Sequence, residues 1–267
     1  MTKRDIILEA IIQEYLNSGE PIGSSELQKC MDIEISPSTI RIYLNKLSQE
    51  GALVQLHVSS GRVPTNDALV QYWRDRLNPA KTMEIESIED FENSANEFGL
   101  FCVAQKNSSE YLKEVIEVSG RFLILTFDTK EVVLKYTKQV KGFLSNLIGS
   151  EMRELKNISA QVGLYELYDK LHQILSSESI ISVGESQLYE IAKAQQDMSF
   201  VEQLLNYEFS FGLKEGVYFD GFVPYGCLAV KQLATIEDED ASLFCFGQIG
   251  SNFGDFLKQG EIKWAKK

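Results

Sequence analysis

Apolar residues near the start of the chain recur with the spacing of amphipathic helices. Residues 5–16 carry apolar side chains at every fourth position and on the adjacent row, which predicts one helix. Gly19 ends this helix because glycine readily adopts the left-handed conformation of a helix stop. Ser24 is a suitable N-cap for a second, short helix over residues 25–31. The pattern therefore predicts two helices within the first 31 residues.

A third helix is predicted over residues 37–50. Ser36 is a favoured N-cap residue, and Pro37 follows it at the first helical position, where proline is tolerated best. Ile40, Leu44 and Leu47 recur at steps of four and three and predict one buried seam. Three short helices in about 50 residues are typical of a helix-turn-helix arrangement.

The remaining faces of this third helix carry hydroxyls, an amide and two cations. Arginine can pair with guanine and asparagine with adenine in the major groove, while hydroxyls reach phosphates. An ordinary solvated helix face explains the same residues equally well from this helix alone. The residues concerned are Ser38, Thr39, Arg41, Ile42, Asn45 and Lys46.

A small β-hairpin is predicted directly after the third helix. Residues 52–58 alternate sufficiently for a strand, residues 59–61 form a turn, and residues 62–65 return as a second strand. A helix-turn-helix followed by a hairpin is a winged helix. The hairpin tip places His57, Ser59, Ser60 and Arg62 around Gly61, a group suited to phosphate or minor-groove contact. For His57, a role in stabilising the turn is an equally good alternative.

The second part of the chain mixes strand and helix patterns. Strands flank a central helical block, so we expect an α+β domain with a helical insertion. The predicted elements are a hairpin at 122–136, helices at 144–158, 164–175 and 187–206 with an interruption near Asp197, strands at 217–223, 226–230 and 243–247, and a helix from about 251.

Charge is distributed unevenly along the 267 residues. The chain has 26 basic and 39 acidic residues and a formal net charge of -13. Residues 1–77 hold eight of the basic and ten of the acidic residues, whereas residues 36–65 hold three basic residues and Glu50 as the one acidic residue. A local basic segment in an acidic chain is a candidate site for a phosphate backbone. Pro79 lies in a short stretch of low apolar content that is typical of a domain junction, so we predict domains over 1–77 and 78–267.

Several classes of protein lack support in the sequence. No apolar stretch is long enough to span a bilayer and no signal region begins the chain, so we expect a cytoplasmic protein. The nucleotide-binding, hydrolase and zinc-protease motifs are missing, and we expect no enzyme activity and no cofactor. The four cysteines are far apart, so we expect buried thiols and no metal site. The acidic run at 237–240 is expected to be a solvated loop, and His172 a helical histidine.

Four motifs in the first part resemble one family. They are Gly19-Glu20-Pro21-Ile22-Gly23-Ser24, Ser36-Pro37-Ser38-Thr39-Ile40-Arg41, Gly51-Ala52-Leu53, and His57-Val58-Ser59-Ser60-Gly61-Arg62-Val63-Pro64-Thr65. Their order and spacing resemble the HrcA family of bacterial heat-inducible transcription repressors. One departure is Ile42, which stands where the family usually has asparagine; an apolar contact with a thymine methyl group would replace amide readout there.

This resemblance implies a dimeric repressor that binds the CIRCE inverted repeat before chaperone operons and is assisted by a GroEL-type chaperonin. It also implies a GAF-like second domain interrupted by a dimerisation region, which we place at about 140–210. A winged helix with a ligand-sensing or protein-partner role is the alternative. The residues expected to contact double-stranded DNA are Ser38, Thr39, Arg41, Ile42, Asn45, Lys46, His57, Ser59, Ser60, Gly61 and Arg62.

Overall fold

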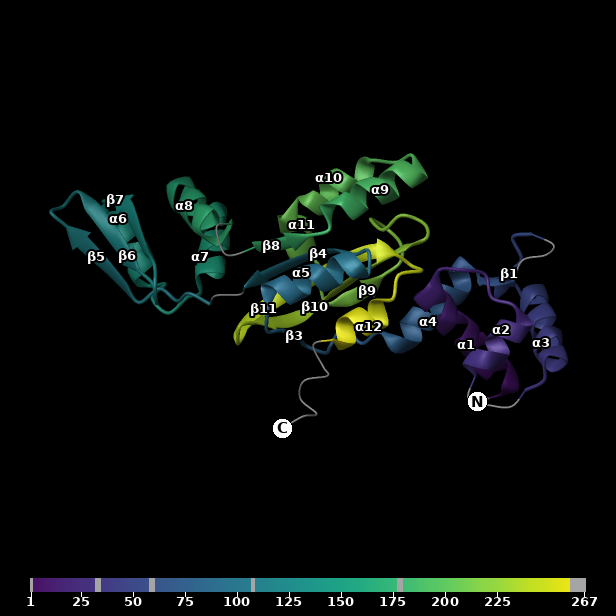
Figure 1. Cartoon of the computed structure of the whole chain (residues 1–267). Coiled ribbons are helices and arrows are strands. Elements are labelled where there is room, and N and C mark those ends of the chain that lie inside the picture. Colours follow the sequence, from purple (N-terminus) through teal and green to yellow (C-terminus); the bar gives the residue numbers. More distant parts are fainter. Residues whose placement is uncertain (1, 32–34, 58–60, 107–108, 177–179, 260–267) are drawn as a thin grey trace, which may run out of the picture. The chain divides into compact units, whose positions relative to one another are not determined.

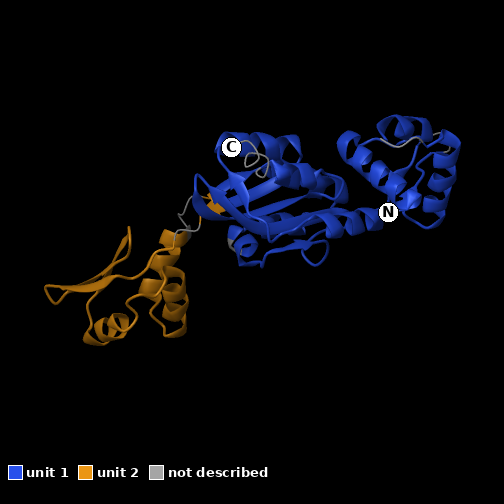
Figure 2. Cartoon of the chain, turned by 90° about the horizontal axis from the view of Figure 1, so that it is seen from below, with its two compact units in different colours: residues 1–104, 181–267 blue, residues 105–180 orange. Residues whose placement is uncertain are grey.

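The computed structural model describes residues 2–31, 35–57, 61–106, 109–176 and 180–259. Its mixture of helices and sheets confirms the predicted α+β class. The chain forms two compact units, shown in Figure 2: Met1–Ala104 together with Ile181–Lys267, and the inserted Gln105–Ile180. The chain leaves the larger unit through β4 (Phe101–Lys106) and returns through β8 (Ile180–Val183), and these strands are neighbours in one sheet.

The larger unit begins with three helices and a two-stranded sheet, here called the N-terminal module (residues 3–64). Their order is the one expected from the sequence, and Ser36 and Pro37 occupy the predicted N-cap and first-turn positions. The strands are much shorter than the predicted 52–58 and 62–65. The elements are α1 (Lys3–Ser18), α2 (Ser24–Cys30), α3 (Pro37–Gln49), β1 (Leu53–Val54) and β2 (Val63–Pro64).

Gly61 lies against the backbone that connects α1 with α2. A Cβ atom at position 61 would lie only 2.3 Å from the carbonyl carbon of Ile22, closer than any real contact allows. The next residue, Arg62, pairs with Ile22 through two backbone hydrogen bonds of 2.9 and 3.0 Å. The hairpin is thus fixed to the helices where only glycine permits the approach.

A six-stranded sheet forms the centre of the larger unit. Its strand order is β3-β10-β11-β4-β8, and β9 pairs with the remaining part of the β10 edge. The long antiparallel pair β10–β11 turns at Glu237 and Asp238, both of which have positive φ, so the predicted acidic loop is a tight hairpin turn. The remaining strands are β3 (Met83–Ile85), β9 (Gly216–Tyr218), β10 (Cys227–Ile236) and β11 (Glu239–Gln248).

Helices cover both faces of this sheet, as Figure 1 shows. On β10, Leu228 and Val230 belong to one buried cluster with residues of α4, α5 and α12. The alternate residues of β10 point to the other face of the sheet, toward α9–α11. For example, the ammonium group of Lys231 lies over the ring of Phe211. The helices are α4 (Asn66–Arg76), α5 (Ile88–Glu97), α9 (Glu185–Gln195), α10 (Ser199–Leu205), α11 (Tyr207–Gly212) and α12 (Phe253–Lys258).

Trp73 on α4 is central to this cluster. Its side chain is 1% exposed, its indole Nε1 donates to the carbonyl of Ile249 at 2.8 Å, and its ring meets Phe253 edge to face. Ile12 and Leu16 of α1 belong to the same cluster. The N-terminal module and the large sheet therefore share buried apolar surface, which stabilises their packing.

The inserted unit consists of a three-stranded antiparallel sheet and three helices. One face of the sheet packs on the helices around Leu125, Val132 and Leu144, all of which are buried. The elements are β5 (Glu114–Val118), β6 (Phe122–Thr126), β7 (Glu131–Lys135), α6 (Lys138–Ser145), α7 (Met152–Gln161) and α8 (Tyr165–Ser176). The predicted hairpin and the helix at 164–175 are confirmed.

Two features of the inserted region differ from the sequence predictions. The helix expected over 144–158 is divided between α6 and α7, because Gly149 with a φ of +94° turns the chain between them. The inserted unit begins and ends earlier in the chain than the predicted 140–210 and contains a sheet as well as helices. Helices α9 and α10 belong to the larger unit, and Gln196 in left-handed conformation separates them near the expected interruption.

The cysteines are partly as expected. Cys102, Cys227 and Cys245 are buried thiols, but Cys30 at the end of α2 is exposed, contrary to the prediction. Burial raises the pKa of the Cys227 thiol to about 11 and raises that of Cys102 well above its usual range. Thiols held in the protonated form react slowly because the thiolate is the nucleophile.

We expect iodoacetamide at pH 8 to label the native protein at Cys30 alone. Desolvation, together with the nearby Glu14 carboxylate, also raises the pKa of Cys30, so its labelling should accelerate as the pH rises. Peptide mass spectrometry measures the modification at each cysteine, and labelling in guanidinium chloride, where all four should react, is the control. Rapid modification of Cys227 in the native protein would contradict the burial described here.

Candidate nucleic-acid interface

The helix α3 has one buried and one exposed side. Ile40, Leu44 and Leu47 are at most 5% exposed, so the predicted seam is confirmed. Arg41 and Ile42 lie on the exposed side, and the Ile42 side chain is 68% exposed. In the described part of the chain, the Arg41 guanidinium makes neither a hydrogen bond nor an ion pair. Both side chains are therefore available to a partner.

Hydroxyl groups surround the N-terminal end of α3. The Ser36 Oγ accepts from the backbone N–H of Thr39 at 3.2 Å and lies 2.9 Å from the hydroxyls of both Ser38 and Thr39. The end of a helix that carries unpaired backbone N–H groups has partial positive charge. The cap therefore gathers hydrogen-bond donors where an anionic group would be stabilised.

Arg62 connects the hairpin to α3. Its Nε donates to the Ser48 Oγ at 2.9 Å and a terminal nitrogen donates to the Asn45 Oδ1 at 3.0 Å. Together with the backbone pairing of Arg62 and Ile22, these bonds fix the hairpin against the exposed side of α3. Two predicted contact residues, Arg62 and Asn45, are thus in contact with each other.

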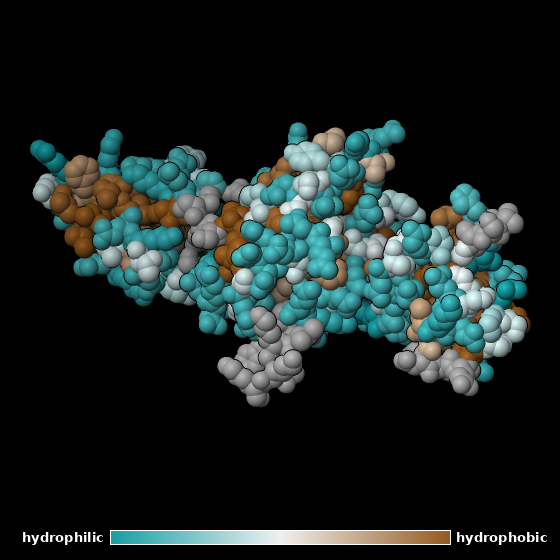
Figure 3. Space-filling model, in the orientation of Figure 1, coloured by the Kyte–Doolittle hydropathy of each residue, from teal (hydrophilic) through white to brown (hydrophobic). Residues whose placement is uncertain are grey.

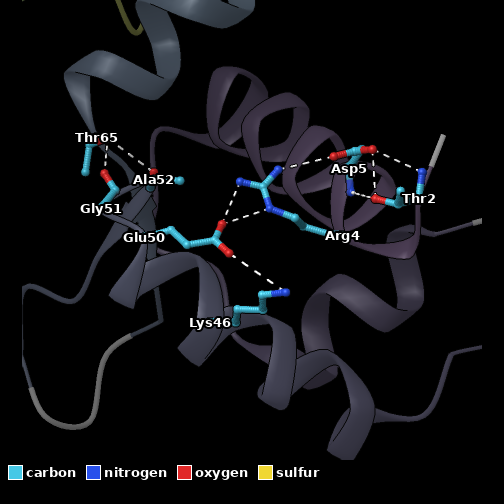
Figure 4. A network of polar contacts seen from close by, with 8 residues as sticks. All are labelled: Thr2, Arg4, Asp5, Lys46, Glu50, Gly51, Ala52 and Thr65. Atoms are coloured by element: carbon cyan, nitrogen blue, oxygen red, sulfur yellow. Dashed lines mark hydrogen bonds and ion pairs between the residues drawn. The ribbon is translucent and has the colours of Figure 1, made fainter.

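A network of charged groups lies at the other end of α3 (Figure 4). The Glu50 carboxylate accepts from Arg4 Nε at 2.8 Å and lies 4.0 Å from the Lys46 ammonium group. The hydrogen bond with Glu50 raises the pKa of Arg4, so Arg4 stays cationic. Glu50 thereby offsets part of the positive charge around Lys46. Nearby, the Thr65 hydroxyl at the start of α4 donates to the Gly51 carbonyl at 2.8 Å.

The remaining predicted contact residues occupy different surroundings. His57 is exposed at the hairpin, and Gly61 is held against Ile22. Ser59 and Ser60 lie outside the described residues. The sequence did not identify Ser48, whose hydroxyl accepts a hydrogen bond from Arg62. Ser48 lies beside the buried Leu44 and Leu47, and its position in the helical pattern does not mark it as a contact residue. The sequence also did not identify Val54 and Leu56, which are 42% and 57% exposed beside His57.

Two other kinds of site are not seen in the described residues. No group of three or more histidine, cysteine, aspartate or glutamate side chains there is arranged to hold a metal ion. Within the same residues, no helix combines the length and apolar character required to cross a membrane.

The fold and this surface define an α+β protein that presents a helix and a hairpin, joined by an arginine, on an N-terminal module. A family model described as the HrcA C-terminal domain matches residues 73–263. The chain belongs to the HrcA family.

Relatives named HrcA agree with this assignment, and one solved structure shares the fold. The chain is 28% identical over 264 residues to a heat-inducible transcription repressor HrcA of Helicobacter pylori, covering 97% of this chain and 94% of the relative. It is 32% identical over 143 residues to the repressor of the same name from Alkaliphilus metalliredigens, covering 54% of this chain and 41% of that one. A crystal structure described as a hypothetical protein shares the fold, with a TM-score of 0.52, 18% identity, and coverage of 98% of this chain and 94% of the other.

Ser36→Ala should lower the free energy of unfolding by about 1 kcal/mol, because the N-cap hydrogen bond to Thr39 is lost. Denaturant unfolding measures this change, and amide hydrogen exchange should locate it in the first turn of α3. Ser38→Ala is the matched control, since the Ser38 hydroxyl contacts Ser36 but does not cap the helix. Equal stability of the two variants would contradict a capping role for Ser36.

Proposed function

We propose that this protein is a dimeric, sequence-specific transcription repressor that binds a CIRCE-type inverted repeat in front of chaperone operons. In this proposal residues 1–77 form a winged helix and residues 78–267 a GAF-like domain with a dimerisation insertion. One observation carries the proposal: in a member of a family with relatives named heat-inducible repressors, α3 exposes Arg41 and Ile42 beside a hairpin fixed to the same helix.

The exposed side of α3 has the chemistry of a major-groove reader. Arg41 can donate two hydrogen bonds to a guanine, and Ile42 can pack against a thymine methyl group. In the proposal, Ser38 and Thr39 at the capped end of the helix donate to phosphate oxygens, and Lys46 supplies a further positive charge. These contacts divide into base readout by Arg41 and Ile42 and backbone binding by the others.

The hairpin would act as the wing. His57 is exposed there, and the guanidinium of Arg62 carries more N–H donors than its contacts with Asn45 and Ser48 use. In the proposal these donors and His57 contact the phosphate backbone, together with Ser59, Ser60 and the backbone of Gly61. Phosphate contacts fix the register of the protein on the duplex without reading its sequence.

The inserted unit offers a surface for the second subunit. Ile116, Ile124 and Val133 lie opposite one another across β5, β6 and β7, on the face turned away from the buried cluster. Phe122 is 47% exposed on the same face, and Figure 3 shows hydrophobic side chains gathered over this sheet. A patch of this kind marks a protein interface. Pairing it with its own copy gives the two-fold symmetry that an inverted repeat requires.

Chaperonin assistance is the remaining part of the proposal. The family resemblance implies a GroEL-type partner, and the apolar sheet face of a monomer is the kind of surface that such a partner binds. Heating that separates the dimer would expose this face and reduce operator binding. Assistance by chaperonin would then return the protein to the dimer.

Arg41→Ala should reduce the preference for the inverted repeat over scrambled DNA by roughly 10- to 100-fold, because guanine contacts contribute about 1–3 kcal/mol. Lys46→Ala should weaken binding to both DNAs about equally and flatten the slope of log affinity against log salt concentration by about one unit. Fluorescence anisotropy at several salt concentrations measures both effects. Lys193→Ala, on α9, is the control for loss of an exposed cation elsewhere.

The same titration tests the proposal as a whole. Tight binding of the inverted repeat with a steep salt dependence supports it. Equal binding of the repeat and the scrambled DNA, both alone and after incubation with chaperonin, would contradict it and favour a protein or small-molecule partner. If Arg41→Ala leaves the ratio of affinities for the inverted repeat and scrambled DNA unchanged, Arg41 does not read a base.

Ile116→Glu should convert the dimer into a monomer, because two carboxylates would be buried at a symmetric apolar contact. Sedimentation equilibrium measures the molecular mass, and the same variant should bind a half-site as before but lose most affinity for the full repeat. Asn157→Glu on α7 introduces the same charge at an exposed position of the same unit and serves as the control. A dimeric Ile116→Glu protein would exclude this sheet face as the interface.

A further inference from the structure

We propose that Arg62 is a positioning residue that holds the amide of Asn45 in one orientation, so that Asn45 offers its Nδ2 donor to a hydrogen-bond acceptor on a base. This inference rests on the proposed DNA-binding function and specifies what one position of the operator must present. It assigns the selectivity of Asn45 to a residue of the hairpin.

The chemistry of the pair determines the orientation of the amide. A guanidinium group only donates hydrogen bonds, and an asparagine side chain has one acceptor atom and one donor atom. The atom of Asn45 that lies 3.0 Å from the Arg62 nitrogen must therefore be Oδ1. The Nδ2 group, bonded to the same carbon, is then directed away from Arg62 on an exposed side chain.

Arg62 itself is held from three sides. Its backbone N–H donates to the Ile22 carbonyl at 2.9 Å, and its own carbonyl accepts from the Ile22 N–H at 3.0 Å. Its Nε donates to the Ser48 Oγ at 2.9 Å, and its neighbour Gly61 is in close contact with the Ile22 backbone. A guanidinium restrained in this way loses little further freedom when it binds the amide, so the orientation of Asn45 is preorganised.

A fixed amide reads different bases from a rotating one. An unrestrained asparagine pairs with adenine through both atoms, accepting from N6 and donating to N7. Because Arg62 occupies the Oδ1 side, Asn45 contributes mainly a single donor, which suits purine N7, guanine O6 or thymine O4. Asn45 follows Arg41 by four residues and lies on the same helix face, so its acceptor belongs to a base near the one that Arg41 reads.

The test uses the full-length protein and inverted-repeat DNA in which single bases lack one acceptor: 7-deazapurines without N7, 2-aminopurine without guanine O6, and 4-thiothymine with a weakened O4. Anisotropy gives the affinity of each DNA for the wild type, Asn45→Ala, Arg62→Ala and the double variant. The wild type should lose roughly 3- to 10-fold at one position, the range of a single hydrogen bond. Asn45→Ala should show no loss there.

The double-mutant cycle identifies the role of Arg62. If Arg62 positions Asn45, Arg62→Ala removes the same base preference, and the double variant is no less selective than Asn45→Ala. Arg62→Lys should keep the salt dependence but fail to restore the preference, because one ammonium group does not reproduce the planar guanidinium fork. Gln49→Ala, exposed on α3, should retain the preference, and circular dichroism melting confirms that each variant is folded.

The possible failures are distinguishable. An Arg62→Ala protein that binds every DNA more weakly by the same factor, with the base preference intact, would show that Arg62 contacts phosphate only and would overturn the inference. Equal responses of the wild type and Asn45→Ala to every substituted DNA would overturn it as well. A wild type that does not distinguish the repeat from scrambled DNA would instead contradict the proposed function itself.

Discussion

The pairing of the Ile22 and Arg62 backbones is the contact on which the N-terminal module depends. Two hydrogen bonds of 2.9 and 3.0 Å join the connection between α1 and α2 to the returning strand of the hairpin, and Gly61 allows the two backbones to approach. The strands β1 and β2 are only two residues long, so their own pairing contributes little stability. The direction of the hairpin therefore follows from its attachment to the helices. The Arg62 side chain extends this attachment to α3 through its hydrogen bonds with Asn45 and Ser48.

Local signals in the sequence were sufficient to predict the helices of this module, but they did not predict its tertiary contacts. Ser36, Pro37 and the apolar seam of α3 predict the helix because capping and periodicity act within a few residues. The contact between Arg62 and Asn45 joins residues 17 positions apart and depends on how the hairpin folds back. Strand β4 was missed for another reason: it is buried on both faces, so its apolar run lacks the alternation that identifies a strand.

The candidate interface also shows why total charge is a poor guide to partners. The chain has a net charge of -13, yet Arg41 is exposed and makes no ion pair within the described residues, and Lys46 is partly offset by Glu50. Screening limits the influence of distant exposed carboxylates to about 10 Å at moderate salt. The field that a phosphate meets at α3 is thus set by neighbouring groups, and the excess of acidic residues elsewhere opposes non-specific binding.

The arrangement of the apolar clusters indicates how heat can act on such a protein. Ile12 of α1 and Trp73 of α4 belong to the cluster of the large sheet. The residues of α3 and the hairpin, among them Ile40 and Leu53, form another cluster with Ile7 and Ile11 of α1. The inserted unit has its own cluster around Leu125 and Leu144. Regions without common buried residues can open with separate free energies. In the proposed function, opening of the inserted unit alone would remove paired binding of the two half-sites, because the second subunit would be lost while α3 and its hairpin still present their exposed residues.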